Sequence, residues 1–164
     1  RQAAVNFTVP SQNTVYADVD GNIGYQTPGN IPIRNPNHSG RLPVPGWTDE
    51  YEWQGYIPFN ELPYTFNPEA GYVATANNAV VEPDYPYPIS YYWAAGFRAR
   101  RIVDMIEQAP GPISVEYIRQ MHGDNRDLNA ETLVKKGYLG NGSRLHRAMR
   151  QSPVGDSAGV RCCG

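Results

Sequence analysis

The placement of proline constrains the fold of this chain more than any other feature of its sequence. Twelve of the fifteen prolines lie before Tyr91. Proline lacks a backbone N–H, so it ends helices and is excluded from the middle of a sheet. We therefore predict strands, turns and extended chain before Tyr91 and helices after it, which together make an α+β fold.

The proline-rich part begins with a hairpin pattern. Residues 14–27 alternate around Asp20-Gly21, which is typical of two strands joined by a two-residue turn. One face would carry Val15, Ala17 and Val19 on the first strand, with Ile23 and Tyr25 pairing across the turn. We predict that residues 29–68 form a long extended segment held in place by aromatic side chains. Residues 71–76 predict a short buried strand.

Apolar spacing and capping residues predict three helices after Tyr91. They cover residues 98–108, residues 115–122 with Ser114 as N-cap, and residues 130–134 with Asp127 or Asn129 as N-cap. Beyond Lys135 the chain is rich in glycine and serine and has no apolar period. We therefore predict an atypical, frayed tail over residues 135–164.

Composition and charge exclude several classes of protein. A length of 164 residues fits one domain, and no run of about 18 apolar residues predicts a membrane-spanning helix. Residues 1–90 carry three basic and nine acidic side chains, and residues 91–164 carry eleven basic and seven acidic ones. Neither part has the dense basic face that nucleic acid requires, so we predict no nucleic-acid partner. Cys162 and Cys163 are adjacent and have no metal-site or redox spacing.

One set of residues has the types found in a hydrolytic triad. Ser114, His122 and Asp124 provide a hydroxyl, an imidazole and a carboxylate within a short stretch. Ser114 also stands directly before a predicted helix, where a serine side chain commonly caps the first N–H groups. We favour the cap over the nucleophile, so this set predicts a helix start rather than an active site.

Two further groups have both a functional and a structural interpretation. Asp18 and Asp20 share a strand face and, with Asn22, could bind a hard cation, but the polar face of a hairpin explains them better. The aromatic residues around Trp47 and Trp53 could stack on a sugar ring, or they could cover the edges of a proline-rich loop. A non-catalytic, aromatic-rich carbohydrate-binding module is therefore the alternative function to an enzyme.

A pair of asparagines follows the predicted strand over residues 71–76. Carboxamide side chains at a strand end can donate N–H groups to a developing negative charge, as an oxyanion hole requires. Asn77-Asn78 also has the composition of a turn, and spacing alone favours the turn. Arg98 opens the next helix, where an arginine usually forms a surface ion pair. From the residue pattern alone we therefore predict an α+β fold without a complete set of catalytic residues.

Seven short motifs occur in order between residues 5 and 133. They are YADVDGNIGY (16–25), GNIPIR (29–34), GRLPVPGW (40–47), EWQGYIPF (52–59), NPEAGYVATANN (67–78), DYP (84–86) and WAAGFR (93–98). Each motif is weak alone. Together they resemble the penicillin acylase (penicillin amidase) family of N-terminal nucleophile hydrolases.

The resemblance implies a four-layer αββα sandwich, of which residues 1–134 would be an internal part of the β subunit. Family members mature from a self-cleaving precursor, and a serine that becomes the first residue of the β chain attacks an amide carbonyl. The resemblance thus implies a periplasmic or secreted enzyme that hydrolyses linear amides, such as β-lactam side-chain amides or acyl-homoserine lactones. The α chain of the processed precursor would be its partner. Because Arg1 is no nucleophile, we expect a fragment that lacks the attacking serine and is inactive alone.

The resemblance also assigns roles to three residues. Asn77 falls on the asparagine whose side-chain N–H contributes to the oxyanion hole, and Arg98 falls on an arginine that organises the site around it. Gly40 falls where family members offer a backbone carbonyl to a structural calcium ion. The acidic calcium ligand expected near residues 87–92 has no counterpart, since Asp84 is the only carboxylate close by. No organic cofactor is implied.

Overall fold

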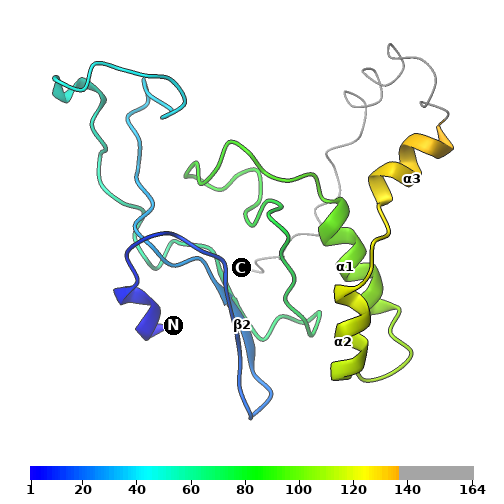
Figure 1. The fold of residues 1–164 in the computed structure, drawn as a ribbon. Coiled ribbons are helices and arrows are strands. Elements are labelled where there is room, and N and C mark those ends of the chain that lie inside the picture. The colour runs from blue at the N-terminus through cyan, green and yellow to red at the C-terminus, as the bar shows by residue number, and fades with distance from the viewer. Residues whose placement is uncertain (137–164) are drawn as a thin grey trace. The chain divides into compact units, whose positions relative to one another are not determined.

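The computed structural model describes residues 1–136, which form two units. The sheet unit contains residues 1–73 and 81–92, and the described part of the helical unit contains residues 74–80 and 93–136. In Figure 1 the first strands of the sheet unit are blue and the helices of the helical unit run from green to orange. Apart from Lys135 and Lys136, the predicted tail lies outside the described residues, as do both cysteines.

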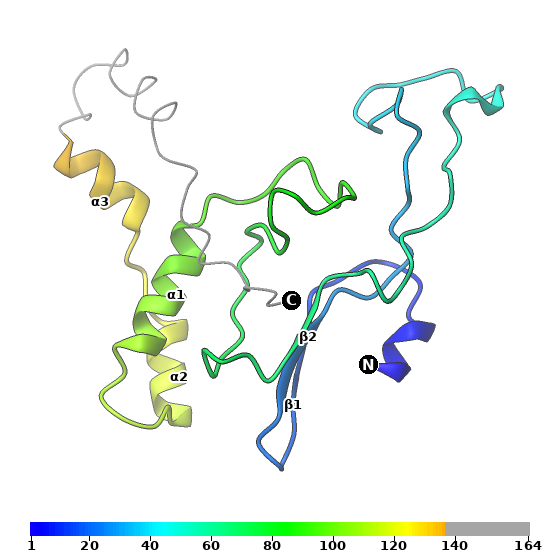
Figure 2. The ribbon, with the colours of Figure 1, turned by 180° about the vertical axis from the view of Figure 1, so that it is seen from behind.

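Three short strands form an antiparallel sheet in the order β1-β2-β3. Their bounds are Thr14–Ala17 for β1, Ile23–Gln26 for β2 and Tyr64–Phe66 for β3. Val15 lies opposite Tyr25 and Ala17 lies opposite Ile23, which confirms the predicted pairing across the turn. Figure 2 shows β1 and β2 side by side as the two arms of the hairpin.

The hairpin turn is longer than predicted. The N–H of Asp18 donates to the carbonyl of Asn22 at 3.0 Å, so three residues ending in Gly21, at φ +86°, form the loop. The Asp18 carboxylate accepts from the N–H groups of Asp20 and Asn22 at 3.0 and 2.8 Å. The side chain of Asn22 and then its N–H hold the pKa of Asp18 below its ordinary value. The carboxylate of Asp18 therefore stabilises the hairpin turn, which agrees with its interpretation as part of the polar face of a hairpin.

Two strand assignments from the sequence are wrong. Strand β3 lies inside the stretch predicted to be irregular, because Tyr64–Phe66 has high β propensity and Pro63 stays outside the paired residues. Residues 71–76 form no strand, because no segment among the described residues pairs with them in a ladder. An apolar run becomes a strand only where a partner supplies hydrogen bonds to its backbone.

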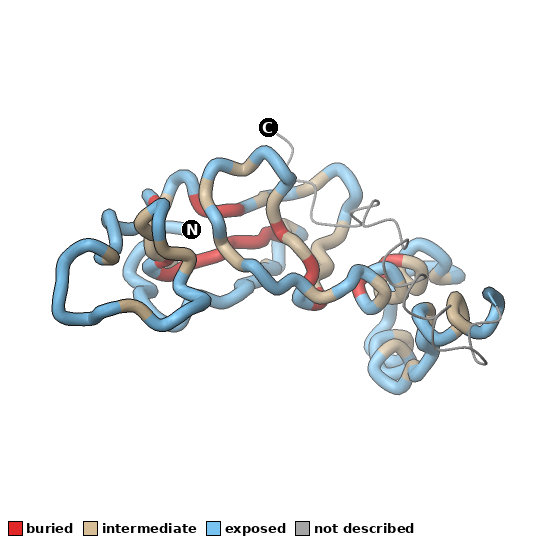
Figure 3. The backbone as a smooth tube through the Cα atoms, turned by 90° about the horizontal axis from the view of Figure 1, so that it is seen from above, coloured by how far each residue is buried: buried red, intermediate tan, exposed pale blue. Residues whose placement is uncertain are grey.

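The core of the sheet unit lies within the proline-rich stretch. The buried cluster is Ile31, Ile57 and Leu62, with Ile33, Phe59, Tyr87 and Ile89 partly buried against it. Backbone bonds hold the two sides of the stretch together, since Ile57 N–H donates to Ile31 O and Ile33 N–H donates to Gly55 O, both at 2.9 Å. The unit also contains two short 3-10 helices, η1 (Gln2–Asn6) and η2 (Asp49–Tyr51). Figure 3 marks the few buried residues in red.

The helical unit contains the three predicted helices with small changes at their ends. Their bounds are Phe97–Glu107 for α1, Val115–His122 for α2 and Leu128–Lys135 for α3. Ser114 Oγ accepts from the N–H of Tyr117 at 3.1 Å, and the Asp127 carboxylate accepts from the N–H groups of Asn129 and Ala130. Both predicted caps are confirmed, with Asp127 as the cap of α3. Within residues 1–136, no helix is long and apolar enough to cross a membrane.

A bidentate ion pair joins α1 to the loop between α2 and α3. Nε and Nη2 of Arg101 donate to the two carboxylate oxygens of Asp124 at 2.8 and 2.9 Å. The side chains of both residues are 19% exposed. The hydrogen bonds from Arg101 lower the pKa of Asp124 and raise that of the guanidinium. The Tyr117 hydroxyl donates to Met105 O at 2.6 Å, which ties α2 to α1.

Acid should destabilise the helical unit through this ion pair. Because the folded-state pKa of Asp124 is depressed, the pair contributes stability above the ordinary Asp pKa of 3.8 and loses it as the pH falls through the folded-state pKa. We expect the thermal midpoint of the helical circular dichroism signal to fall as the pH drops below 3.8. Asp124→Asn should show a smaller fall, since it has no carboxylate to protonate. Equal falls in the two proteins would contradict this expectation.

Candidate functional site

Asn77 lies in a tight turn of the helical unit. Its φ is +64°, in the left-handed region that asparagine tolerates better than most residues. Its backbone carbonyl accepts a hydrogen bond from the N–H of Ala94 at 2.8 Å, and its side chain is exposed. The turn predicted from spacing is therefore present, and it presents the amide of Asn77 at the surface of the described residues.

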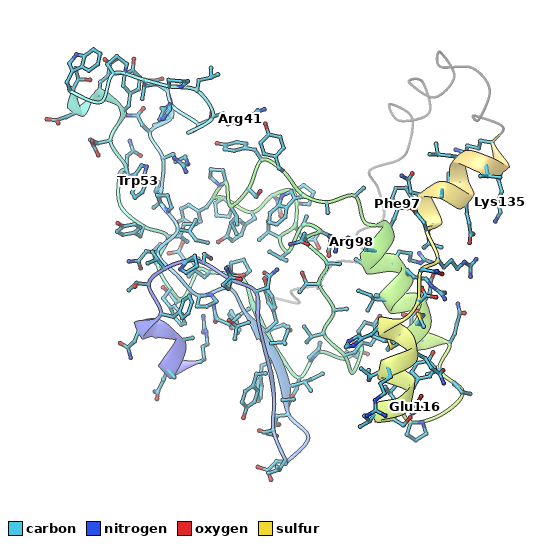
Figure 4. The ribbon with its side chains drawn as sticks, in the orientation of Figure 1. Arg41, Trp53, Phe97, Arg98, Glu116 and Lys135 are labelled. Carbon is cyan, nitrogen blue, oxygen red and sulfur yellow. The ribbon has the colours of Figure 1, made fainter. Side chains whose placement is uncertain are left out.

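Arg98 contacts both Asn77 and the residue before it. Nη2 of Arg98 donates to Oδ1 of Asn77 and to the carbonyl of Ala76, each at 2.8 Å. Figure 4 labels Arg98 beside Phe97 at the start of α1, the end of the helix from which it reaches residues 76 and 77. The structure thus brings together two residues that lie 21 positions apart in the sequence.

The arginine decides which way the amide of Asn77 faces. A guanidinium has donors and no acceptor, so the amide must turn its oxygen toward Arg98 and its NH₂ group away. No described residue accepts a hydrogen bond from Nδ2 of Asn77. The arrangement leaves a neutral donor pair available to a ligand that carries a negatively charged oxygen.

Asn78 differs from its neighbour, although the sequence places the two carboxamides together. It is 7% exposed, and both ends of its amide bond to the backbone of the turn. Its Oδ1 accepts from the N–H of Ala76 and its Nδ2 donates to the carbonyl of Ala79, both at 3.0 Å. Of the two predicted donors, only Asn77 is available. Sequence reasoning missed the contacts of Asn78 and Ala94, because backbone partners leave no signal in the residue pattern.

The triad-like set does not form a catalytic site. Ser114 caps α2, and Asp124 is paired with Arg101. A nucleophilic serine needs a base within hydrogen-bond reach, and that base needs an orienting acid. The structure therefore confirms the capping interpretation of Ser114.

Gly40 does not lie in a metal site built from the described residues. At its φ of +77°, a Cβ would overlap Nη1 of Arg34, so the guanidinium packs against the glycine. Calcium takes about six to eight oxygen ligands, and residues 1–136 contain no group of three or more His, Cys, Asp or Glu side chains that could hold a metal ion. A nearby positive guanidinium also disfavours a cation. The described side chains alone therefore supply no calcium site at Gly40, and calcium binding there stays a prediction.

Gly40→Ala should destabilise the sheet unit. The new Cβ would collide with Arg34, and an alanine at φ +77° pays a conformational penalty of about 1–2 kcal/mol. We expect the free energy of unfolding to fall by at least that amount in urea denaturation followed by tryptophan fluorescence. Gly71→Ala is the matched control, because Gly71 also has a positive φ, at +74°, and nothing lies within 4 Å of its added Cβ. Equal losses in the two variants would contradict the role of Arg34.

The aromatic residues of the sheet unit do not form one flat face. Trp47 is 85% exposed, and the rings of Trp53 and Tyr56 meet edge to face at 69° with centroids 6.2 Å apart. Arg34 lies 5.9 Å from the Trp53 ring centroid, and Figure 4 labels Trp53 in this part of the chain. Stacking on a sugar requires an open ring face, whereas these two rings pack against each other. The Trp53–Tyr56 contact agrees with the structural interpretation, whereas the 85% exposed Trp47 does not distinguish between the two interpretations.

Comparison with known proteins gives one family. The sequence profile of the penicillin amidase family matches residues 1–157. The chain is 38% identical over 112 residues to penicillin acylase 2 proenzyme of Pseudomonas sp. strain SE83, covering 68% of this chain and 14% of that protein. It is 42% identical over 102 residues to penicillin G acylase of Escherichia coli, covering 60% and 12%. It is 40% identical over 93 residues to acyl-homoserine lactone acylase QuiP of Pseudomonas fluorescens, covering 57% and 11%.

A solved structure has a similar fold. Thermostable penicillin G acylase from Alcaligenes faecalis superposes with a TM-score of 0.64 at 30% sequence identity, covering 94% of this chain and 26% of that one. The chain spans between 11% and 14% of the length of the three curated relatives named above.

Proposed function

Because this chain belongs to the penicillin amidase family, we propose that it supplies the oxyanion donor of an enzyme that hydrolyses linear amides. One observation carries the proposal, the 2.8 Å hydrogen bond from Nη2 of Arg98 to Oδ1 of Asn77. The family resemblance gives these two residues the roles of donor and organiser, and their contact is what those roles require. Relatives named penicillin acylase and acyl-homoserine lactone acylase support an acyl-amide hydrolase.

In the proposed reaction an N-terminal serine attacks the carbonyl carbon of the amide, and its own α-amine takes the hydroxyl proton. The carbonyl oxygen becomes negatively charged in the tetrahedral intermediate, where Nδ2 of Asn77 donates a hydrogen bond to it. The C–N bond then breaks, the amine leaves with the proton, and water hydrolyses the acyl-serine to release the acid. Arg98 makes no bond to the substrate; it holds Oδ1 so that the NH₂ group of Asn77 faces away from α1.

Several parts of this machinery would come from outside the chain. We propose that the serine nucleophile, the α chain and the remaining strands of an αββα sandwich belong to other segments of a longer precursor. The share of the relatives that the chain spans, 11% to 14%, supports this division, and one relative is named a proenzyme. The chain alone should therefore have no hydrolase activity.

The substrate class and location follow the same reasoning. Penicillin G and acyl-homoserine lactones both carry an acyl group on an amide nitrogen, so we propose an acyl amide as substrate. A periplasmic or secreted location, implied by the resemblance, is a further prediction that cell fractionation tests. A calcium ion bound through the backbone carbonyl of Gly40, implied by the resemblance, stays a prediction and has no part in the proposed steps.

The proposal is tested with the complete protein that contains this chain. The mature enzyme is incubated with penicillin G and, separately, with an N-acyl-homoserine lactone, and the released amine is measured. We expect release from at least one of them, and none from the 164-residue chain alone. A complete, correctly processed protein that releases no amine from either substrate or from an N-acyl anilide would contradict the proposal.

A further inference from the structure

We propose that Asn78 is a positioning residue, which fixes the direction in which Asn77 presents its amide. The inference rests on the proposed oxyanion role of Asn77 and adds a residue to it. Asn78 itself is 7% exposed, and both ends of its amide bond to backbone groups. It acts on Asn77 through the backbone of the turn that they share.

The amide of Asn78 closes the turn around its neighbour. Its Oδ1 accepts from the N–H of Ala76, and its Nδ2 donates to the carbonyl of Ala79, both at 3.0 Å. One side chain thus links the residue before Asn77 to the residue after Asn78. Because the bonded backbone groups lie on both sides of Asn77, rotation of its backbone would break one of them.

This fixation is needed because Asn77 adopts an unfavourable backbone conformation. A φ of +64° costs an L-residue conformational energy, and it persists only where surrounding contacts hold it. Arg98 holds the carbonyl of Ala76, and Ala94 holds the carbonyl of Asn77, each at 2.8 Å. Asn78 supplies the remaining bonds, to one N–H and one carbonyl of the same turn.

The direction of the catalytic amide depends on this turn. Nδ2 of Asn77 must lie within hydrogen-bond reach of the position that the oxyanion will occupy, and an ångström of displacement lowers the rate strongly. Without Asn78, the turn is held by Arg98 and Ala94 alone, and the N–H of Ala76 loses its partner. We therefore expect a slower chemical step while substrate binding changes little.

The test is a double-mutant cycle in the complete enzyme, with the acyl amide that it turns over. Asn78→Ala should lower kcat about tenfold, corresponding to the loss of its two hydrogen bonds, and change KM by less than about twofold. In the Asn77→Ala background the same substitution should lower kcat no further, because the donor that it positions is gone. A residue with a purely structural role would lower kcat in both backgrounds.

The outcomes separate this inference from the proposed function. If Asn77→Ala leaves kcat unchanged, the proposed oxyanion role fails. If Asn77→Ala lowers kcat but the effects of the two substitutions multiply, or Asn78→Ala has no effect, the positioning role fails and the oxyanion role stands. Should Asn78→Ala not fold, Asn78→Asp retains the size of the side chain and the acceptor for Ala76, and the same cycle is measured with it.

Asn67→Ala is the matched control for the cycle. Asn67 also has a positive φ, at +46°, and its side chain also bonds to backbone, accepting from the N–H of Ile23 at 2.9 Å. It belongs to the sheet unit and has no place in the proposed reaction. Asn67→Ala should leave kcat unchanged. A tenfold fall in the kcat of Asn78→Ala is then not a general effect of removing an asparagine from a turn.

Discussion

Asn77→Ala in the complete enzyme should lower kcat by about 10²–10³-fold, the usual cost of removing one oxyanion donor. In the proposed reaction Nδ2 donates to an oxygen that carries negative charge mainly in the transition state, so KM should change little. The fold should persist, because the side chain of Asn77 is exposed and its backbone carbonyl keeps the bond from Ala94. Steady-state kinetics with the preferred acyl amide measure both constants.

Two variants distinguish the loss of the Nδ2 donor of Asn77 from the strain of an alanine at the same positive φ. Asn77→Asp keeps the shape of the side chain and an acceptor for Arg98 but has no N–H donors, so it should lose as much activity as the alanine variant. Asn67→Ala removes an asparagine from an equally unusual φ in the sheet unit and should leave kcat unchanged. A kcat of Asn77→Ala within a few-fold of that of the wild-type enzyme would remove the donor assignment.

Arg98→Ala should lower kcat by about 10–100-fold, less than loss of the donor itself. A hydrogen bond from a charged donor contributes about 1.5–3 kcal/mol, and here one nitrogen bonds both Oδ1 of Asn77 and the carbonyl of Ala76. Without it the amide can rotate, and its oxygen would then repel the developing oxyanion. Arg98→Lys should recover only part of kcat, because an ammonium group on a flexible stem does not hold its donors in the one fixed plane in which Nη2 makes both bonds.

Arg100→Ala provides the control on the same helix. Arg100 pairs with Asp104 across one turn of α1, and its side chain is 59% exposed. Exposed pairs of this kind contribute about 0–1 kcal/mol to stability. The variant should retain wild-type kcat, and a loss there equal to that of Arg98→Ala would show that α1 tolerates no arginine replacement, which would contradict the specific role of Arg98.

Local signals in the sequence predict the helices well and the sheet only in part. The apolar spacing of α1 and the caps Ser114 and Asp127 depend on residues a few positions apart, so they are visible in the chain. Strand β3 is fixed by pairing with β2, about forty positions away, and prolines on both sides conceal it. Residues 71–76 show the converse, an apolar run without a ladder partner among the described residues.

The candidate site shows the same limit. Spacing alone makes Asn77 a turn residue, and the structure confirms the turn while leaving the amide available. Nothing in the residue pattern brings Arg98 to it, because the contact depends on the path of the 21 intervening positions. Only the family resemblance gave the two residues a joint role. Asn78 was indistinguishable from its neighbour in the sequence, whereas in the structure the two differ in burial, in φ and in hydrogen-bond partners.

The division of the chain into units has a consequence for how such proteins vary. Residues 74–80 and 93–98 share the helical unit, whereas residues 81–92, which connect them, are part of the sheet unit. The contact between Asn77 and Arg98 therefore lies within one unit, although the connection between the two residues belongs to the other. Tyr87 and Ile89 of this connection pack against the buried cluster of the sheet unit. A recognition loop or tag inserted between residues 81 and 92 would therefore have to keep these two side chains in place.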